Sequence, residues 1–361
     1  MGRPLKIPEL LDVIVSFVDA PKDLRVSALV HRSWTLPSQA RLFSSIYFNQ
    51  NPLQARHLVS ALQGSPHLAP LIQSLTLINI VSSALERWGA LSFSGLRTLT
   101  LRTQLIFERG VIETIHTLIS SPSLVSVTMS CHFRDRGDSL RIWDGCSNTI
   151  KNLTFNPGDG VDLGGAHEPS PRASGRIKLE SFGSTRSLEV ICSWLQHPSC
   201  PFDISGLSGF RCNDWIRGAF ADIIAPALAS IEVLSLMDPR RTKDISRFHR
   251  LQQLDLELDF PFDEDFGLIC TIHSEDRHRL QALRLHVSRL DVADARALAR
   301  ELCQLQSVFS HIQMVHICVV VASPEVRMNL ASYFGQLDPK TALHWEFDAF
   351  EPEMPWYTRL V

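Results

Sequence analysis

One short apolar pattern recurs along most of the chain and constrains its fold more than any other feature. The pattern is L-x-x-L-x-L with x often polar, as in "LRTLTL" from residue 96, "LQQLDL" from 251 and "LQALRL" from 280. Self-similarity at a fixed short period predicts a solenoid whose repeats contact only their neighbours. The first residue of each central apolar pair falls at 75, 99, 127, 153, 234, 254, 283, 315 and 343, which gives intervals of 24, 28, 26, 81, 20, 29, 32 and 28 residues.

The interval of 81 residues corresponds to about three repeats, with weaker strands predicted at "KLESFGS" near 180 and "PFDISGL" near 203. Between the strands, apolar residues recur at steps of three and four, which indicates helices. Alternating strands and helices predict a parallel sheet with helices outside. The predicted helices lie around 112–119, 188–195, 216–227, 292–302 and 326–337.

The local pattern resembles leucine-rich repeats, although the asparagine of the strict motif is mostly absent. We therefore predict an α/β fold for residues 49–361: an irregular leucine-rich-repeat-like solenoid with parallel strands on a concave face. A Gly-, Pro- and Ser-rich stretch at about 156–177 lacks periodicity and predicts a loop insertion. This loop is either a tolerated insertion or a binding loop, with Ser170-Pro171 as a candidate modification site.

The first 48 residues are too apolar for an isolated module of their size. Pro8 suits the first turn of a helix, and Glu9, Asp12, Ser16 and Asp19 form one narrow polar stripe on it. A second helix is predicted from Asp23, with Val26, Val30 and Trp34 on one row, interrupted by Pro37. A third is predicted at 38–45. Three such helices cannot bury their apolar surface among themselves, so they need a partner or the rest of the chain.

These residues resemble the F-box. The likeness rests on Ile7-Pro8-Glu9-Leu10-Leu11, Leu29-Val30 and Arg32-Ser33-Trp34, with Ile7 in place of Leu and His31 in place of Cys. The resemblance implies a three-helix F-box at residues 1–48 that docks on a Skp-family adaptor and, through it, on a cullin. It implies that the adaptor contacts Ile7, Pro8, Leu10, Leu11, Ile14, Val30 and Trp34. The alternative is that these helices only cap the solenoid.

An F-box followed by degenerate repeats is similar to a group of fungal F-box proteins. The phrases "LQGSPHLAPLIQSLTL" and "LISSPSLVSV" carry this likeness, because Ser-Pro-x-Leu precedes a strand in each. The resemblance implies the substrate-recognition subunit of a ubiquitin ligase, which binds a target protein and is not itself an enzyme. The alternative is a non-catalytic repeat scaffold.

The residues between the paired apolar positions should point to the concave surface. In the early strands they are small and uncharged, such as Thr76 and Thr100, whereas the later strands carry charge. The hypothesis is that the charged half recognises the target; otherwise these residues form only a solvated strand face. The candidate target-binding residues are Asp255, Glu257, Arg284, His286 and His316.

Several function classes are disfavoured. A net charge of −3 gives no general attraction to nucleic acid, and no apolar run reaches about 18 residues, so no membrane partner is expected. Eight cysteines without a CxxC pair predict reduced thiols in the cytoplasm or nucleus. Cys192, His197, Cys200 and Cys212 lack a usual zinc spacing, so no metal or other cofactor is expected, and no catalytic motif is found.

Overall fold

The computed structural model describes residues 8–18, 20–49, 52–79, 85–107, 109–133, 136–158, 175–185, 188–212, 219–237, 248–258, 280–287, 314–319 and 342–347. The chain divides into two compact units. The first comprises Met1–Leu179 with Ser193–Asp203, and the second comprises Glu180–Cys192 with Ile204–Val361. Both combine parallel strands with helices, which confirms the predicted α/β class.

Three short helices open the first unit. They are α1 (Pro8–Ser16), α2 (Pro21–Val30) and α3 (Arg32–Phe43). Both α1 and α2 pack on α3, which in turn contacts the first strand of the sheet and the short helix η1. Leu11, Val15 and Leu24 are buried among the described residues of this region.

The break between the second and third helices differs from the prediction. It falls at His31, whose backbone is extended (φ −160°, ψ 147°) and whose Nδ1 accepts the Ser33 N–H at 3.2 Å. Pro37, which was expected to interrupt the second helix, lies inside α3. Trp34 therefore belongs to α3 and not to the same helix as Val30.

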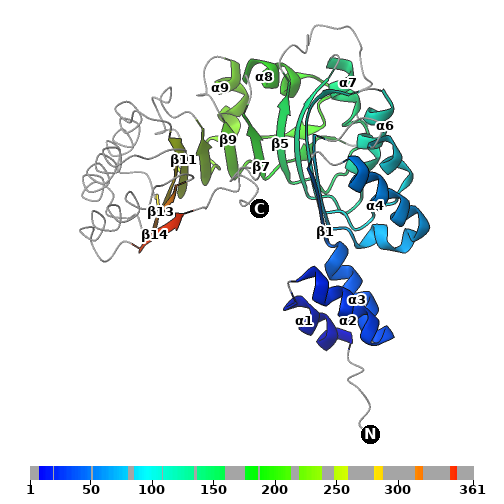
Figure 1. Ribbon diagram of the computed structural model, residues 1–361. Helices are drawn as coiled ribbons and strands as arrows, with labels where there is room; N and C mark the ends of the chain where they lie inside the picture. The colour runs from blue at the N-terminus through cyan, green and yellow to red at the C-terminus, as the bar shows by residue number, and fades with distance from the viewer. Residues whose placement is uncertain are drawn as a thin grey trace. The chain divides into compact units, whose positions relative to one another are not determined.

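In the first unit, five strands lie side by side in chain order, and each is parallel to the next. They are β1 (Ser45–Asn49), β2 (Ser74–Ile78), β3 (Thr98–Ile106), β4 (Ser126–His132) and β5 (Asn152–Pro157). The connecting helices α4, α6 and α7 lie on one side of these strands (Figure 1). The connections contain α4 (Pro52–Gly64), η1 (Pro66–Leu71), η2 (Glu86–Ala90), α6 (Arg109–Ile119) and α7 (Arg136–Arg141).

The second unit repeats this arrangement, with seven parallel strands among its described residues. They are β7 (Ser181–Ser184), β9 (Gly209–Cys212), β10 (Val233–Leu236), β11 (Gln253–Leu258), β12 (Ala282–Val287), β13 (Met314–Val319) and β14 (Ala342–Phe347). Between the earlier strands of the chain lie α8 (Leu188–Gln196), α9 (Ala219–Ile224) and η3 (Ala225–Ala227). The division between the units falls within α8, after Cys192. The helices predicted at 292–302 and 326–337 lie outside the described residues.

The predicted strand positions align in register. In the first unit Leu75, Leu99, Val127 and Leu153 are successive partners, and in the second unit Leu234, Leu254, Leu283, Val315 and Leu343 are. The long interval holds β7 and β9, whose aligned residues are Phe182 and Phe210. The strand predicted at "KLESFGS" is therefore confirmed.

The strand predicted at "PFDISGL" does not belong to the large sheet. Its residues form β8 (Phe202–Asp203), which pairs with β6 (Ile177–Lys178) in a separate two-stranded sheet. The large sheet uses β9 instead, a few residues later. β1 was not predicted either. The boundary between the predicted domains at residue 48 stays a prediction. The predicted loop at about 156–177 falls mostly on residues 159–174, which lie outside the described residues.

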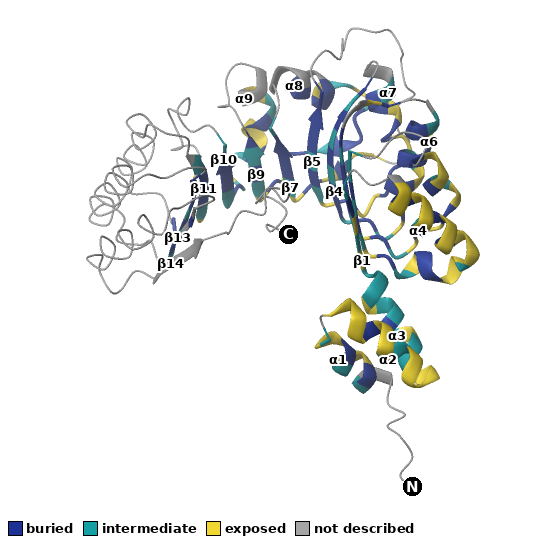
Figure 2. Ribbon diagram, viewed as in Figure 1, coloured by how far each residue is buried: buried dark blue, intermediate teal, exposed yellow. Residues whose placement is uncertain are grey.

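In the strands whose burial is described, the apolar pair lies in the core. Leu75 and Leu77 of β2 are almost fully buried, as are Leu99 and Leu101 of β3 and the corresponding pairs of β4, β5, β10, β11 and β12. The strands are accordingly dark in Figure 2. Because side chains alternate along a strand, the residues between the pair members lie on the opposite face.

Hydrogen bonds from serine and threonine hydroxyls join adjacent repeats. Ser121 Oγ donates to Phe93 O at 2.7 Å, and Thr149 Oγ1 donates to Leu124 O at 2.8 Å. In the second unit, Ser230 Oγ donates to Leu207 O at 2.7 Å. A buried carbonyl group without a hydrogen-bond donor lowers stability, and these hydroxyls supply such donors. The chain mostly lacks the asparagine of the strict repeat motif.

The backbone repeats a second contact between neighbouring strands. The carbonyl of Gln73 accepts the N–H groups of both Arg97 and Thr98, at 2.8 and 2.9 Å. One repeat later, the carbonyl of Arg97 accepts from Val125 and Ser126 at 2.8 and 2.9 Å. The residue just before each of these strands therefore fixes where the next strand begins.

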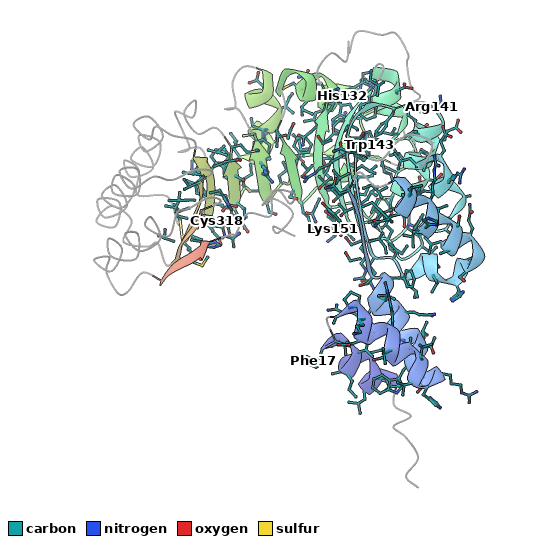
Figure 3. The ribbon with its side chains drawn as sticks, in the orientation of Figure 1. Phe17, His132, Arg141, Trp143, Lys151 and Cys318 are labelled. Atoms are coloured by element: carbon teal, nitrogen blue, oxygen red, sulfur yellow. The ribbon has the colours of Figure 1, made fainter. Side chains whose placement is uncertain are left out.

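An aromatic cluster holds the segment 193–203 in the first unit. The rings of Trp143 and Phe202 meet edge to face with centroids 5.2 Å apart, and those of Phe155 and Trp194 are 4.7 Å apart. Trp143 lies in the interior of the unit (Figure 3). Each such pair contributes about 0.5–1.5 kcal/mol beyond the area that it buries.

Candidate functional site

An apolar face of α2 is exposed. Leu29 and Val30 lie three and four positions after Val26, so all three residues share one side of the helix. Their side chains are 56%, 87% and 69% exposed, and Figure 2 shows much of these helices as exposed or intermediate. We call these three residues the α2 apolar face. Phe17, just after α1, is 80% exposed as well, and Figure 3 labels it at the edge of the helices.

The seven predicted adaptor-binding residues have different environments. Val30 is exposed, whereas Leu10, Ile14 and Trp34 are half-buried. Leu11 is buried, so its side chain supports the packing of the helices. Ile7 lies outside the described residues, as does the side chain of Pro8.

Sequence reasoning did not single out the most exposed apolar side chains of this region. Neither Phe17 nor Leu29 was among the predicted contacts, although Leu29 is part of the motif. Their exposure could not be derived from spacing alone, because the apolar surplus of the helices does not say which residues face inward.

The second candidate surface is a row of side chains across the second unit. The register aligns Arg211 of β9, Ser235 of β10, Asp255 of β11, Arg284 of β12 and His316 of β13. Aligned residues of parallel strands point to the same face. We call these five residues the charged row. Of the predicted target-binding residues, it contains Asp255, Arg284 and His316.

The other two predicted target-binding residues occupy the next row. Glu257 is aligned with His286, which is aligned with Cys318. His286 is buried and Glu257 is half-buried. The structure therefore brings all five predicted residues onto three neighbouring strands, in two rows.

Asp255 is the buried centre of the charged row. Its side chain is only 3% exposed, and this burial raises its pKa above the usual range for aspartate. A hydrogen bond from Gln253 and the positive charges of Arg284 and Arg211 act in the opposite direction. The loss of hydration on burial outweighs the hydrogen bond and the two positive charges. The charged form of Asp255 therefore lowers the stability of the folded chain.

The two arginines on either side of Asp255 are half-buried. Arg211 was not among the predicted site residues, because β9 is short and carries no Leu-x-Leu pair. The Nη2 atom of Arg211 lies 3.7 Å from Met237 Sδ. The Nε atom of Arg284 is buried and has no hydrogen-bond partner among the described residues.

The corresponding row of the first unit is uncharged. Thr76, Thr100, Thr128 and Thr154 are aligned on β2 to β5, next to Tyr47 of β1. Hydroxyl groups can donate and accept hydrogen bonds but offer no charge to a partner. Among the described strands, the aligned rows of the second unit therefore offer the stronger electrostatic recognition.

Metal and membrane sites were also considered. Cys192, Cys200 and Cys212 are buried, and the described residues contain no group of three or more His, Cys, Asp or Glu side chains that could hold a metal ion. Over the same parts of the chain, no helix has the length and apolar character that crossing a bilayer requires.

Comparison with protein-family models finds no match for this chain, and comparison with curated proteins finds none either. The functional proposal therefore depends on the two surfaces themselves.

Proposed function

We propose that the protein is a non-catalytic substrate receptor of a Skp–cullin–F-box ubiquitin ligase. On this proposal the N-terminal helices are an F-box that docks on a Skp-family adaptor. The later strands form a leucine-rich-repeat-like array that holds a target protein. Ubiquitin transfer is then promoted by proximity, because holding a target lysine near a charged carrier raises its effective concentration.

The observation that carries the proposal is the α2 apolar face. Leu29 is 87% exposed on a short helix, although burying one leucine side chain contributes about 1.5–3 kcal/mol. A contiguous apolar helix face that remains exposed is typical of a protein interaction site. The face lies within the segment that resembles the F-box, and Val30 belongs to both the face and the motif.

A second function is supported by a different contact. Because α3 contacts β1 and η1, the N-terminal helices adjoin the first strand of the sheet, where the terminal cap of a repeat array would lie. In that case the protein would be a repeat scaffold. The cap accounts for the contacts of α3, but it gives no role to the α2 apolar face.

Adaptor binding by the purified full-length chain separates the two functions. The triple variant Val26→Gln, Leu29→Gln, Val30→Gln removes the α2 apolar face while keeping helix-compatible residues. We expect it to weaken adaptor binding at least about tenfold, since such contacts cost more than 1 kcal/mol when they lie at the centre of an interface. Its melting temperature should stay close to that of the unaltered protein.

The matched control is Leu53→Gln, which removes an exposed leucine from α4. This control should bind the adaptor normally. If the folded, unaltered chain does not bind the adaptor, or if the triple variant binds as well as the control, the receptor proposal is wrong and the scaffold function takes its place.

A further inference from the structure

We propose that the charged row binds an acidic segment of the target protein, which lies across the strands with two carboxylate side chains near Arg211 and Arg284. This inference rests on the proposed function, because it gives the chemistry of the target that the same array would hold. It concerns the second unit alone.

The spacing of the two arginines suits an extended segment. Arg211 and Arg284 are aligned on β9 and β12, with β10 and β11 between them. Neighbouring strands are about 4.8 Å apart, so the two positions are separated by about 14 Å. An extended peptide rises about 3.3 Å per residue, so acidic residues four positions apart are about 13 Å apart and point to the same side.

The charges of the row favour an anionic ligand. The row holds two guanidinium groups and the single carboxylate of Asp255, and burial disfavours the charged form of that carboxylate. Gln253 Nε2 already donates to both Asp255 oxygens, at 2.9 and 3.2 Å. The Nε of Arg284, by contrast, has no hydrogen-bond partner among the described residues, and arginine binds carboxylates through paired donors.

Carboxylates fit this row better than phosphates. A phosphorylated residue carries about −1.5 to −2 charges at neutral pH, and it would meet Asp255 in the row and Glu257 in the next one. A glutamate or aspartate side chain carries one charge and meets less repulsion. The charged row therefore selects acidic residues of a protein chain.

The test uses the full-length protein and a fluorescein-labelled probe of about twelve residues, a flexible neutral peptide with glutamates at positions i and i+4 that can reach both arginines when it is extended. Fluorescence anisotropy measures its binding. Three matched probes replace the two glutamates by glutamine, by lysine or by phosphoserine. The variants are Arg284→Gln, Arg211→Gln and Asp255→Asn, and the control is Arg250→Gln, which removes an exposed arginine just before β11.

We expect the glutamate probe to bind more tightly than the other three, and less tightly as salt rises. Arg284→Gln and Arg211→Gln should each weaken binding by about tenfold. Asp255→Asn should strengthen it by about threefold, because it removes a like charge next to the ligand. Damage to the fold would weaken binding in all three variants, so the opposite sign for Asp255→Asn identifies a direct electrostatic effect.

Adaptor binding is measured on the same preparations. The inference is overturned, even where the adaptor still binds, by any of three results. The glutamate probe is not preferred, the phosphoserine probe binds most tightly, or binding does not depend on salt. Binding of the glutamate probe without adaptor binding leaves the inference standing and removes the receptor function. Equal binding by Arg284→Gln and Arg250→Gln also overturns the inference.

Discussion

The side-chain amide of Gln253 donates to both carboxylate oxygens of Asp255, with Nε2 2.9 Å from Oδ1 and 3.2 Å from Oδ2. The two residues are two positions apart on β11, so they point to the same face of the strand. The Gln253 amide stabilises the Asp255 carboxylate, which is buried in the row between Arg211 and Arg284. Even with these partners, burial keeps the pKa of Asp255 above its usual range.

The raised pKa of Asp255 makes stability depend on pH in a defined direction. Below about pH 4, Asp255 is protonated in both the folded and the unfolded chain. As the pH rises above this value, the unfolded chain loses the proton first, so the folded chain binds more protons and its free energy of unfolding falls. The fall ends once the pH exceeds the folded pKa.

The variant Asp255→Asn should remove this loss, since asparagine still accepts a hydrogen bond from Gln253. We expect the variant to match the unaltered protein near pH 4 and to be more stable at pH 7, by about 1.4 kcal/mol for each unit by which the folded pKa is raised. Urea unfolding at a series of pH values measures the difference. The difference in free energy of unfolding, variant minus unaltered protein, should rise from pH 4 to pH 7. A fall over this range would contradict the prediction.

The hydroxyl of Ser121 should contribute measurably to stability. Its Oγ donates to the buried carbonyl of Phe93 in the preceding repeat, at 2.7 Å. Ser121→Ala removes this donor and leaves the carbonyl with the Leu96 N–H, at 3.0 Å, so we expect a loss of about 0.5–1.5 kcal/mol in the free energy of unfolding. The control is Thr117→Ala, whose hydroxyl bonds to Glu113 O within an exposed part of α6 and whose loss should change stability by less than about 0.5 kcal/mol. Equal effects would show that the bond between repeats adds nothing.

Gly95 should not tolerate a side chain. A Cβ atom at this position would collide with the backbone carbonyl oxygen of Pro70, and neither backbone can move freely between two repeats. We expect Gly95→Ala to destabilise the protein by about 1–3 kcal/mol. At Gly64, the last residue of α4, a Cβ meets nothing within 4 Å, so Gly64→Ala should be neutral or stabilise by up to about 1 kcal/mol. Thermal unfolding of the two variants in parallel checks the contrast.

Two apolar residues of α2, two positions apart, should behave differently on truncation. Leu24 is buried and Val26 is 56% exposed. Leu24→Ala should destabilise the N-terminal helices by about 2–5 kcal/mol, whereas Val26→Ala should cost less than about 0.5 kcal/mol. Hydrogen exchange of the backbone amides of α1 to α3 reads this out directly. Similar exchange rates in the two variants would mean that the Leu24 side chain does not stabilise the N-terminal helices.

Most strands were predictable because two constraints act on the same residues. A buried pair must recur every second residue within a strand, and strands must recur at the length of one repeat. The residues at 75, 99, 127 and 153 satisfy both, and they are partners in the sheet. The strands that escaped prediction also carry a pair, but without leucine: β1 has Ile46 and Phe48 and follows directly on α3, and β9 has Phe210 and Cys212, is only four residues long and begins with glycine.

The helix boundary at His31 was missed for a different reason. Proline is a strong helix breaker in the interior of a helix, so Pro37 was taken as the break. The actual break depends on the Nδ1 of His31 accepting the Ser33 N–H, a capping role that histidine seldom takes. Such a local hydrogen bond cannot be derived from residue spacing.

The candidate site was predictable in position but not in environment. Alternation along the strands placed Asp255, Arg284 and His316 on one face, and the register agrees. The burial of Asp255 depends on the side chains of neighbouring strands, which only the folded structure brings together. Arg211 required the position of β9, so it could not be assigned to the row beforehand.

The repeated contact between strands also bears on how such a chain can change over evolutionary time. Several strands begin where the carbonyl before the previous strand receives two N–H groups, as at Gln73 and Arg97, so a whole repeat can be duplicated or lost without altering this junction. A one-residue insertion inside a strand would instead turn its apolar pair outward. New binding specificity is therefore expected to arise through exchange of complete repeats, or through single replacements at the positions between the paired apolar residues.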